Sequence, residues 1–318
     1  MLSFTRKQTT HRIEDNRWAV ILAGGDGTRL RAFTRSITGD DRPKQFCPIF
    51  GGKTLIDQTR ERVATSVASQ NTFMVVTASH ERFYHSLTRT RLQQERILVQ
   101  PTNKGTAPAI LYSLLRIASI SPSAIVAIFP SDHYFADDVK FASYVEAGFN
   151  AAQRSSTVML LGISPEGPEV EYGWIEPYPS ILGRKAGSVS RVQRFWEKPS
   201  IGLARKLMER GCLWNSFVMI GRVDVFLRMI KSALPQTTAA FERICSSIGS
   251  SRERTLLNEL YSSLPEINFS HEVLTVRAHD LSVMKVDDVG WSDLGEPSRV
   301  LTTLGRIGTQ VHLARSAS

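Results

Sequence analysis

The stretch from residue 18 to residue 44 constrains this chain more than any other part. Residues 18–23 form an apolar run rich in Val, Ile and Leu, which is typical of a strand buried on both faces. Glycines follow at once, at Gly24, Gly25 and Gly27. They allow positive φ and let backbone N–H groups approach a ligand without a Cβ in the way. Thr28, Arg29 and the later Lys44 add a hydroxyl and two cations, so the stretch predicts a cradle for phosphate groups.

Two well-known phosphate motifs do not fit this cradle. The Walker A pattern requires Lys-Ser or Lys-Thr after its last glycine, but Thr28-Arg29 follows Gly27. The dinucleotide pattern GxGxxG fails because Leu30 stands at the position of its third glycine. For the glycines alone, a strand-to-helix turn without a ligand stays an open interpretation.

Composition narrows the class of protein. The chain has 318 residues, of which 42% are hydrophobic and 22% charged, which suits one large α/β domain or two small ones. The formal charge is +9, but Lys and Arg are scattered without a dense run or aromatic interleaving. We therefore expect anionic small-molecule substrates and no nucleic acid.

The location expected from the sequence is the cytoplasm. No apolar run approaches the roughly 18 residues of a membrane span, and the first 17 residues contain no apolar signal segment. Cys47, Cys212 and Cys245 lie far apart, as expected of reduced thiols.

Strands and helices are predicted to alternate in the first half of the chain. The expected strands are 18–23, 73–78, 96–101, 124–129 and 157–163, and the expected helices are 53–67, 106–120 and 138–154, with Thr106 as an N-cap. This order predicts a mostly parallel sheet flanked by helices, with ligands beyond the carboxyl ends of the strands. The glycine loop 24–27 and Asp132 then share one cleft.

The second half is predicted to be more mixed, without a convincing linker. Expected strands are 171–177, 188–197, 213–221 and most of 273–289, and expected helices are 200–211, 223–233, 236–247 and 252–264. We therefore predict a disordered tail over 1–16, one domain over 17–300 and a C-terminal tail over 301–318.

The motif Leu-Ala-Gly-Gly-Asp-Gly-Thr-Arg-Leu over 22–30 resembles the signature of the sugar-1-phosphate nucleotidyltransferases. Pro43-Lys44-Gln45-Phe46 resembles the form of the mannose-1-phosphate guanylyltransferase branch. The loop between them departs from it, being longer, with Arg31-Ala32 where that branch often has Trp-Pro. Over roughly 18–300 the resemblance implies a GT-A-like (Rossmann-like) α/β fold with a mixed, mostly parallel central sheet flanked by helices. The arginine-rich segment 31–42 is a hypothetical mobile lid.

The reaction implied is attack by a sugar-1-phosphate oxygen on the α-phosphorus of a nucleoside triphosphate, with expulsion of pyrophosphate. The nucleophile is already an anion, so catalysis consists of positioning and electrostatics. The segment QPTNKGTAPA over 100–109 also resembles the family, with departures at Gln100 and Lys104. The resemblance assigns catalysis to Arg29, Lys44, Asp132 and Lys198, and nucleotide binding to Leu22, Ala23, Gly24, Gly25, Gly27, Thr28, Gln100, Asn103, Gly105 and Thr106.

Two aspartates match the metal-binding positions of the family. Asp132 in PSDH and Asp293 in GWSDLG would hold Mg²⁺, which prefers carboxylate oxygens and substrate phosphates. On position alone, Asp132 is more often a helix N-cap or turn residue. Asp287 and Asp288 are nearby competitors for the second position, and His133 is interpreted as structural.

The resemblance assigns binding of the sugar phosphate to three segments, YGWI over 172–175, EKP over 197–199 and WNS over 214–216. Their residues are Gly173, which would leave room for the hexose, Glu197, Lys198 and Asn215. Phe217 stands where the family has glycine.

The predicted reaction is GTP plus mannose 1-phosphate giving GDP-mannose plus diphosphate, with Mg²⁺ and with a homodimer left open. Alternatives are the same chemistry with another base or hexose, and a catalytically silent paralogue. A glycosyltransferase of similar fold is disfavoured, because His133-Tyr134 follow Asp132 where a DxD motif would continue.

Overall fold

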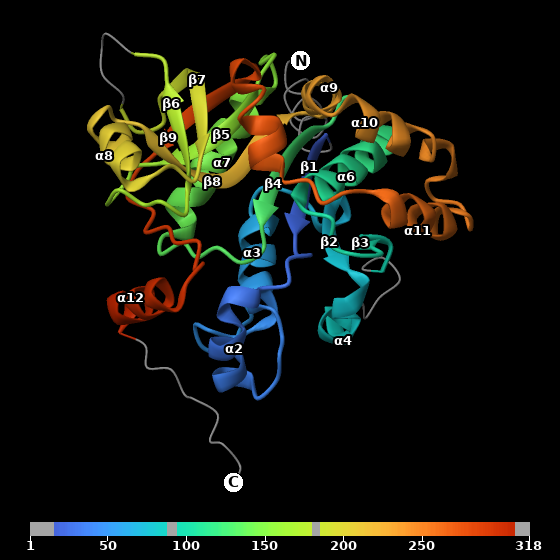
Figure 1. Ribbon diagram of the computed structural model, residues 1–318, viewed down its shortest axis with the longest axis horizontal. Helices are drawn as coiled ribbons and strands as arrows, with labels where there is room; N and C mark the ends of the chain where they lie inside the picture. Colours follow the sequence, from blue (N-terminus) through green and yellow to red (C-terminus); the bar gives the residue numbers. More distant parts are fainter. Residues whose placement is uncertain (1–15, 88–93, 180–184, 309–318) are drawn as a thin grey trace, which may run out of the picture.

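A single sheet forms the centre of the molecule, as the computed structural model shows (Figure 1). The structure describes residues 16–87, 94–179 and 185–308. Residues 1–15 of the tail predicted over 1–16 and residues 309–318 of the tail predicted over 301–318 therefore lie outside the described residues. The strands in this part of the chain are β1 (Arg17–Leu22), β2 (Thr72–Thr77), β3 (Ile97–Gln100), β4 (Ile125–Pro130), β5 (Val158–Ile163), β6 (Gly173–Pro177), β7 (Val189–Glu197), β8 (Leu213–Arg222) and β9 (Leu281–Val286).

The strand order is β3-β2-β1-β4-β8-β5-β9-β7-β6, and β6 also pairs with β8. β1 to β4 are mutually parallel, as are β5 and β9, whereas β8 is antiparallel to β4 and β5. β7 is antiparallel to β6 and β9, and β6 is antiparallel to β8. The predicted α/β fold with a mixed sheet is confirmed, and its parallel part consists of β1–β4 and the β5–β9 pair. The carboxyl ends of β1–β4 therefore meet at one edge, where β8 begins.

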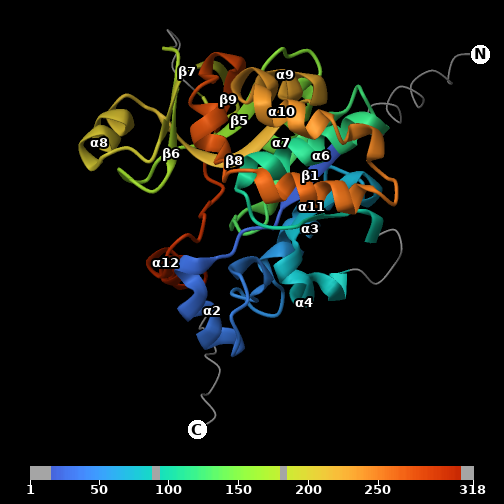
Figure 2. The ribbon, with the colours of Figure 1, turned by 45° about the vertical axis from the view of Figure 1, so that its right-hand side comes forward.

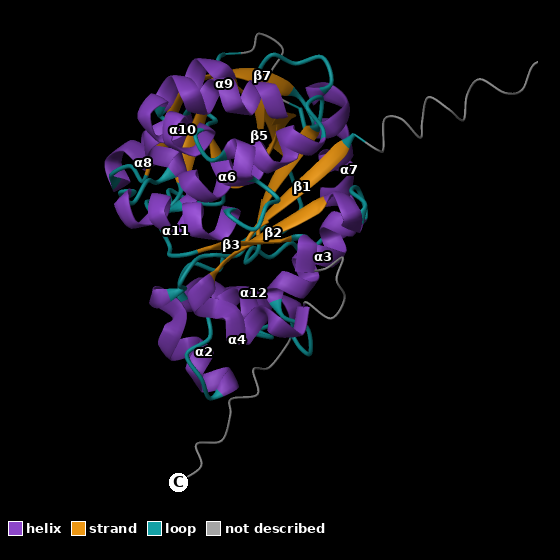
Figure 3. Cartoon of the chain, turned by 90° about the vertical axis from the view of Figure 1, so that its right-hand side faces the viewer, coloured by secondary structure: helices purple, strands orange, loops and turns teal. Residues whose placement is uncertain are grey.

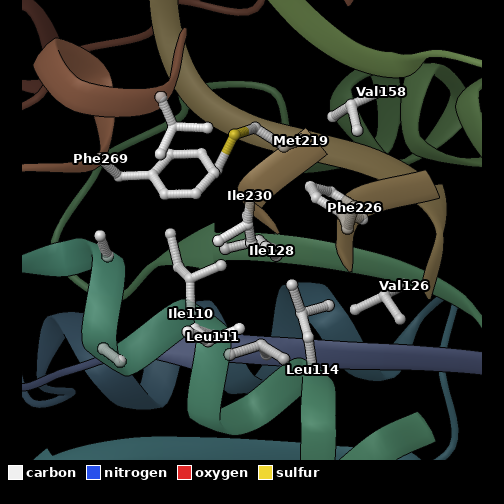
Figure 4. Packing of buried hydrophobic residues seen from close by; sticks show 14 of the residues in the cluster. Ile110, Leu111, Leu114, Val126, Ile128, Val158, Met219, Phe226, Ile230 and Phe269 are labelled. Atoms are coloured by element: carbon white, nitrogen blue, oxygen red, sulfur yellow. The ribbon is translucent and has the colours of Figure 1, made fainter. Parts of the chain in front are cut away.

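Helices cover both faces of this sheet (Figure 3). One face carries α6 (Thr106–Ile120), α9 (Val223–Ala233), α10 (Pro235–Glu242) and α11 (Glu253–Ser263), and the other carries α3 (Leu55–Ala64), α7 (Asp138–Ala152) and α8 (Ile201–Glu209). The strand period of two explains both layers. Trp18 and Val20 of β1 join one core cluster, while Ala19 and Ile21 join the other. Figure 4 shows the first cluster, in which side chains of α6 meet those of β4 and α9.

A third cluster joins two segments that are distant in the chain. α2 (Arg31–Thr38) packs against α12 (Pro297–Ile307) through buried residues that include Leu30, Val300 and Leu304 (Figures 1 and 2). The expected loop 31–42 is therefore largely a helix, and α12 crosses the domain boundary predicted at 300. Leu30, Phe33 and Ile37 recur at helical spacing and carry α2 into this cluster.

Two arginines of this segment form ion pairs with neighbouring aspartates, and the lid stays a hypothesis. Arg35 forms two hydrogen bonds with Asp41, at 2.8 and 2.5 Å. Arg42 forms two with Asp40, at 2.7 and 2.8 Å. The hydrogen bonds from the Arg42 guanidinium are the main reason that the pKa of Asp40 is lowered to about 2.

Other elements differ from their predicted bounds because short helical turns interrupt them. The expected strand over 273–289 begins only at β9, because Ser270–Leu274 form a π-helix and Ala278–Asp280 a 3-10 helix. The helix expected over 236–247 ends at Glu242, and Cys245–Ser247 form a separate 3-10 turn. A short α4 (Glu81–Tyr84) follows β2. Among the helices of the described residues, none has the length and apolar character of a membrane span.

Candidate active site

A cleft of about 400 Å³ lies at the carboxyl edge of β1–β4. The predicted site residues that line it are Leu22, Gly24, Gly25, Gln100, Asn103, Gly105, Thr106, Asp132, Gly173, Glu197, Asn215 and Asp293. The predicted residues outside its lining are Ala23, Gly27, Thr28, Arg29, Lys44 and Lys198. The lining residues come from both halves of the chain. The sheet therefore brings residues of the predicted nucleotide and sugar-phosphate groups to one cleft.

Side chains from other segments donate hydrogen bonds to the backbone of the glycine loop. Gln45 Nε2 donates to the carbonyl oxygens of Ala23 at 3.0 Å and Gly25 at 2.8 Å. Thr77 Oγ1 donates to the carbonyl of Gly24 at 2.9 Å. A Cβ on Gly24 would lie 2.8 Å from Gln100 Nε2, so a side chain there would displace Gln100. A Cβ on Gly25 would meet nothing within 4 Å, so this backbone faces free space.

Lys44 links the two predicted metal aspartates. Its Nζ donates to the carbonyl oxygens of Asp293 at 2.6 Å and Leu294 at 3.2 Å, and lies 3.3 Å from Asp132 Oδ2. The side chain is only 11% exposed. These protein groups occupy the directions in which an ammonium donates, so Lys44 joins the loops of Asp132 and Asp293 and lies outside the cleft lining.

Asp293 is held in place by three neighbouring groups. Its Oδ1 accepts hydrogen bonds from Gly295 N at 2.9 Å, Tyr172 Oη at 3.1 Å and Arg299 Nη1 at 2.8 Å. Burial by itself would raise the pKa of Asp293, but the electrostatic effects of His133, then of Arg299 and Lys44, outweigh it and keep this pKa below its ordinary value. Asp293 is therefore an anion at neutral pH. Arg299 lies on α12 and was not predicted from the sequence.

Asp132 and Asp293 both face the cleft as carboxylates, which is a donor set that suits Mg²⁺ when substrate phosphates complete the shell. Within the described ranges, no group of three or more His, Cys, Asp and Glu residues surrounds a single point. His133 is buried, which lowers its pKa, and its Nδ1 accepts from Trp291 Nε1 at 3.2 Å. It lines the cleft beside Asp132.

Glu171 connects the glycine loop with the predicted sugar-phosphate lysine. One of its oxygens, Oε2, accepts from Arg29 Nη1 at 2.9 Å and from Lys198 Nζ at 3.3 Å. Lys198 and then Arg29 lower the pKa of Glu171. Arg29 and Lys198 were predicted from the sequence but Glu171 was not, because a surface carboxylate beside a motif carries no signal of its own.

Gly173 pairs with Glu197 across β6 and β7 at the sugar end of the cleft. A Cβ there would lie 2.7 Å from the Phe195 ring and 3.2 Å from Glu197 Oε2. The Phe195 ring by itself therefore disfavours a side chain at this position, and the room for a hexose stays a prediction. Burial raises the pKa of Glu197, which lines the cleft.

The segment 264–274 crosses the nucleotide end of the cleft, which sequence reasoning missed. Ile267 N donates to the carbonyl of Lys104 at 2.9 Å, and Ala107 N donates to the carbonyl of Ile267 at 3.1 Å. Glu266, Asn268 and Ser270 consequently line the cleft. Thr106 is the first residue of α6 rather than its N-cap, and its Oγ1 accepts from Phe269 N at 2.9 Å.

Gly105 is expected to be intolerant of any side chain, since its φ is +83° and a Cβ would lie 2.4 Å from the carbonyl oxygen of Ile267. Gly105→Ala should lower the free energy of unfolding by about 3 kcal/mol or more, through strain and the forced separation of two backbone segments. Urea unfolding followed by circular dichroism measures this. Gly51→Ala is the matched control, because Gly51 has φ +76° and open space around its Cβ position; we expect a loss of about 1 kcal/mol. Equal losses would contradict the backbone contact.

These features, a glycine loop after a buried strand and two carboxylates at the adjoining strand ends, agree with the family comparison. The family model described as "Nucleotidyl transferase" matches residues 18–307. The chain belongs to the nucleotidyl transferase family. The match includes α12 and hence Arg299, which lies beyond most of the motifs discussed above.

Relatives with established names show which members this chain is similar to. The xanthan biosynthesis protein XanB of Xanthomonas campestris pv. campestris strain B100 is 29% identical over 286 residues, which are 89% of this chain and 58% of that protein. The mannose-1-phosphate guanylyltransferase of Escherichia coli strain K12 is 28% identical over 284 residues, covering 87% of this chain and 58% of that protein. The chain therefore spans just over half the length of these two relatives.

The fold is shared with a solved structure from Thermus thermophilus, a protein described as a mannose-1-phosphate geranyltransferase. The TM-score is 0.77 at 29% identity, and the alignment covers 93% of this chain and 80% of that one. The central sheet and its helices thus form the nucleotidyltransferase fold.

Proposed function

We propose that the chain transfers a guanylyl group from GTP to mannose 1-phosphate, forming GDP-mannose and diphosphate. The observation that carries this proposal is that one cleft is lined by Gly24 and Gly25 on one side and by Glu197 and Asn215 on the other, with Asp132 and Asp293 also in its lining. A site for two phosphorylated substrates needs this arrangement. The choice of guanine and mannose is supported by the similarity to the E. coli enzyme of that name.

The triphosphate is proposed to lie on the glycine loop, where the Gly25 backbone is accessible and Gln45 keeps the loop in shape. Arg29 follows this loop in the chain, and its side chain is 57% exposed. If it releases Glu171, its guanidinium can form two parallel hydrogen bonds to a phosphate group. Gln100 and Asn103 then lie beside the base or the ribose. Their amide groups both donate and accept hydrogen bonds.

The sugar phosphate is proposed to enter from the side of β6 to β8. Glu197 and Asn215 would accept and donate hydrogen bonds to hexose hydroxyls, and Lys198 would bind the phosphate. Because the attacking phosphate oxygen is already anionic, the chain needs only to bring it in line with the α-phosphorus and to exclude water. Mg²⁺ held by Asp132 and Asp293 would supply charge neutralisation of the triphosphate and of the departing diphosphate.

A pyrophosphate-release screen tests the function directly. GTP, ATP, UTP, CTP and dTTP are each paired with mannose 1-phosphate, glucose 1-phosphate and N-acetylglucosamine 1-phosphate in the presence of Mg²⁺. We expect the GTP and mannose 1-phosphate pair to give the highest kcat/KM. A different best pair would change the assigned substrates within the family, and no release with any pair would identify a silent paralogue. Cytoplasmic action and a homodimer stay predictions.

Lys198→Ala is expected to impair mainly the use of the sugar phosphate, because the Lys198 side chain is 45% exposed and lies at the sugar side of Glu171. Losing one charge-assisted phosphate contact should raise KM for the hexose 1-phosphate by about 10-fold or more, with a smaller change in KM for the nucleotide. Steady-state kinetics with each substrate varied in turn measures both constants. Lys140→Ala, which removes an exposed lysine paired with Asp288, is the control. Unchanged constants for the hexose 1-phosphate in Lys198→Ala would refute the assignment.

A further inference from the structure

Phe217 lies in a backbone conformation that a phenylalanine rarely adopts. Its φ is +58°, in the left-handed region that favours glycine. Strained residues of this kind persist where the surrounding structure enforces them, and they cluster at functional sites. Phe217 also lines the active-site cleft, so the strained position and the site coincide.

Phe217 lies at a bulge in β8, where it lines the cleft and also packs against the core cluster that contains Phe269. Gly162 pairs with Asn215 and Leu160 pairs with Met219, so two residues of β5 span the distance that four residues of β8 cover. Ser216 fastens the bulge, because its Oγ donates to the Leu161 carbonyl at 2.6 Å. Bulges beside active sites redirect side chains that a regular strand would place elsewhere.

Asn215 and Phe217 both lie at the bulge and line the same cleft. Phe217 N donates to Asn215 Oδ1 at 3.1 Å, and both residues line the cleft together with Glu197 and Gly173. The Phe217 ring packs edge to face against Phe269, with centroids 6.4 Å apart. The ring is therefore held between the segment that closes the nucleotide end and the residues proposed to bind the hexose.

We propose that Phe217 sets the size limit of the hexose site and excludes hexose 1-phosphates that carry a bulky substituent such as an N-acetylamino group. The inference rests on the proposed function and deepens it. The half-buried ring occupies volume beside Asn215 that a glycine in the same conformation would leave empty. A filled pocket rejects a larger substrate by steric overlap, which is the strongest form of selection available to an apolar side chain.

Glucose 1-phosphate and N-acetylglucosamine 1-phosphate test this limit, because they differ only in the substituent on one carbon. The measured quantity is the ratio of kcat/KM for the N-acetylated substrate to that for glucose 1-phosphate, with the best nucleotide of the screen. We expect Phe217→Gly and Phe217→Ala each to raise this ratio by about 10-fold or more over the unmodified chain. Phe217→Gly removes the ring and the strain, whereas Phe217→Ala removes the ring and keeps a Cβ at positive φ.

Asp288→Gly is the matched control for strain relief, since Asp288 has φ +54° and an 85% exposed side chain. It should leave the ratio unchanged. A ratio within about twofold of the unmodified chain in both Phe217 variants would overturn the proposal. So would a loss of activity with mannose 1-phosphate without any gain for the N-acetylated substrate, which would identify the ring as a stacking surface instead. Circular dichroism checks folding, and if both variants unfold, Phe217→Leu should still raise the ratio by about threefold.

The proposed function and this inference fail in different ways. If the unmodified chain releases no pyrophosphate with any substrate pair, the proposed function is wrong. Calorimetric titration with the two hexose 1-phosphates then tests Phe217 by itself. Tighter binding of the N-acetylated compound by Phe217→Gly would support the size limit, and unchanged preference would overturn it.

Discussion

Asp132→Asn is expected to lower the rate of pyrophosphate release by at least about 100-fold, and the same change at Asp293 should have a similar effect. Each substitution removes one of the two carboxylates that line the cleft in which the substrate phosphates are proposed to bind. At Asp132 it also removes the anion that lies 3.3 Å from Lys44 Nζ, so a positive charge in a nearly buried position loses a partner. A continuous pyrophosphate assay at several Mg²⁺ concentrations measures the loss.

Asp288→Asn is the control for these variants, because Asp288 lies on the same segment as Asp293 but is 85% exposed. It should retain nearly full activity, and circular dichroism should show that all three variants are folded under the assay conditions. Turnover within about fivefold of the unmodified chain in Asp132→Asn or Asp293→Asn would contradict the assigned metal-binding role.

Arg299→Ala is expected to affect both stability and activity, because Arg299 is the strongest partner of the Asp293 carboxylate. Its Nη1 lies 2.8 Å from Oδ1 and 3.0 Å from Oδ2, its Nη2 lies 3.3 Å from Glu169, and its guanidinium lies 4.4 Å from the centre of the Tyr172 ring. Removing it leaves a largely buried carboxylate with fewer donors. We expect a loss of about 2–3 kcal/mol in the free energy of unfolding and a fall of about 10-fold or more in kcat.

Arg306→Ala provides the comparison on the same helix. Arg306 and its partner Glu166 are 59% and 60% exposed, so their ion pair should contribute less than about 0.5 kcal/mol. Urea unfolding and steady-state kinetics of the two variants separate a specific effect of Arg299 from a general disturbance of α12. Equal, small losses would show that Tyr172, Gly295 and Lys44 are enough to hold Asp293.

The local pattern of the chain was sufficient to predict most elements, especially where the period of buried residues was unambiguous. β1, α6 and α9 have nearly the predicted bounds, because their apolar residues recur every second or every third to fourth position. The cleft followed from the same pattern, since parallel strands bring their carboxyl ends to one edge. It contains Gly24, Gln100 and Asp132 from three separate strand ends.

Prediction failed where a segment's conformation depends on a distant partner. α2 was taken for a loop because its eight residues show only a short apolar stripe, whose partner is α12 at the other end of the chain. The sequence predicts a strand over most of 273–289, where Val273 and Leu274 are adjacent apolar residues, and both are buried in the structure. Burial of two adjacent residues does not distinguish a helical turn from a strand, and the structure has helical turns at Ser270–Leu274 and Ala278–Asp280.

The sequence by itself determined the alternation of strands and helices, the glycine loop and the presence of both predicted metal aspartates, because these depend on local periodicity and on residue type. The tertiary structure alone decided which charges neutralise one another. Arg29 and Lys198 share Glu171, Lys44 spans Asp132 and the Asp293 loop, and Arg299 fixes the Asp293 carboxylate. Electrostatic partners are set by distance in space. Arg299 and Asp293 are 6 positions apart, but the other pairs are 27 to 250 positions apart along the chain and meet only after the sheet has formed.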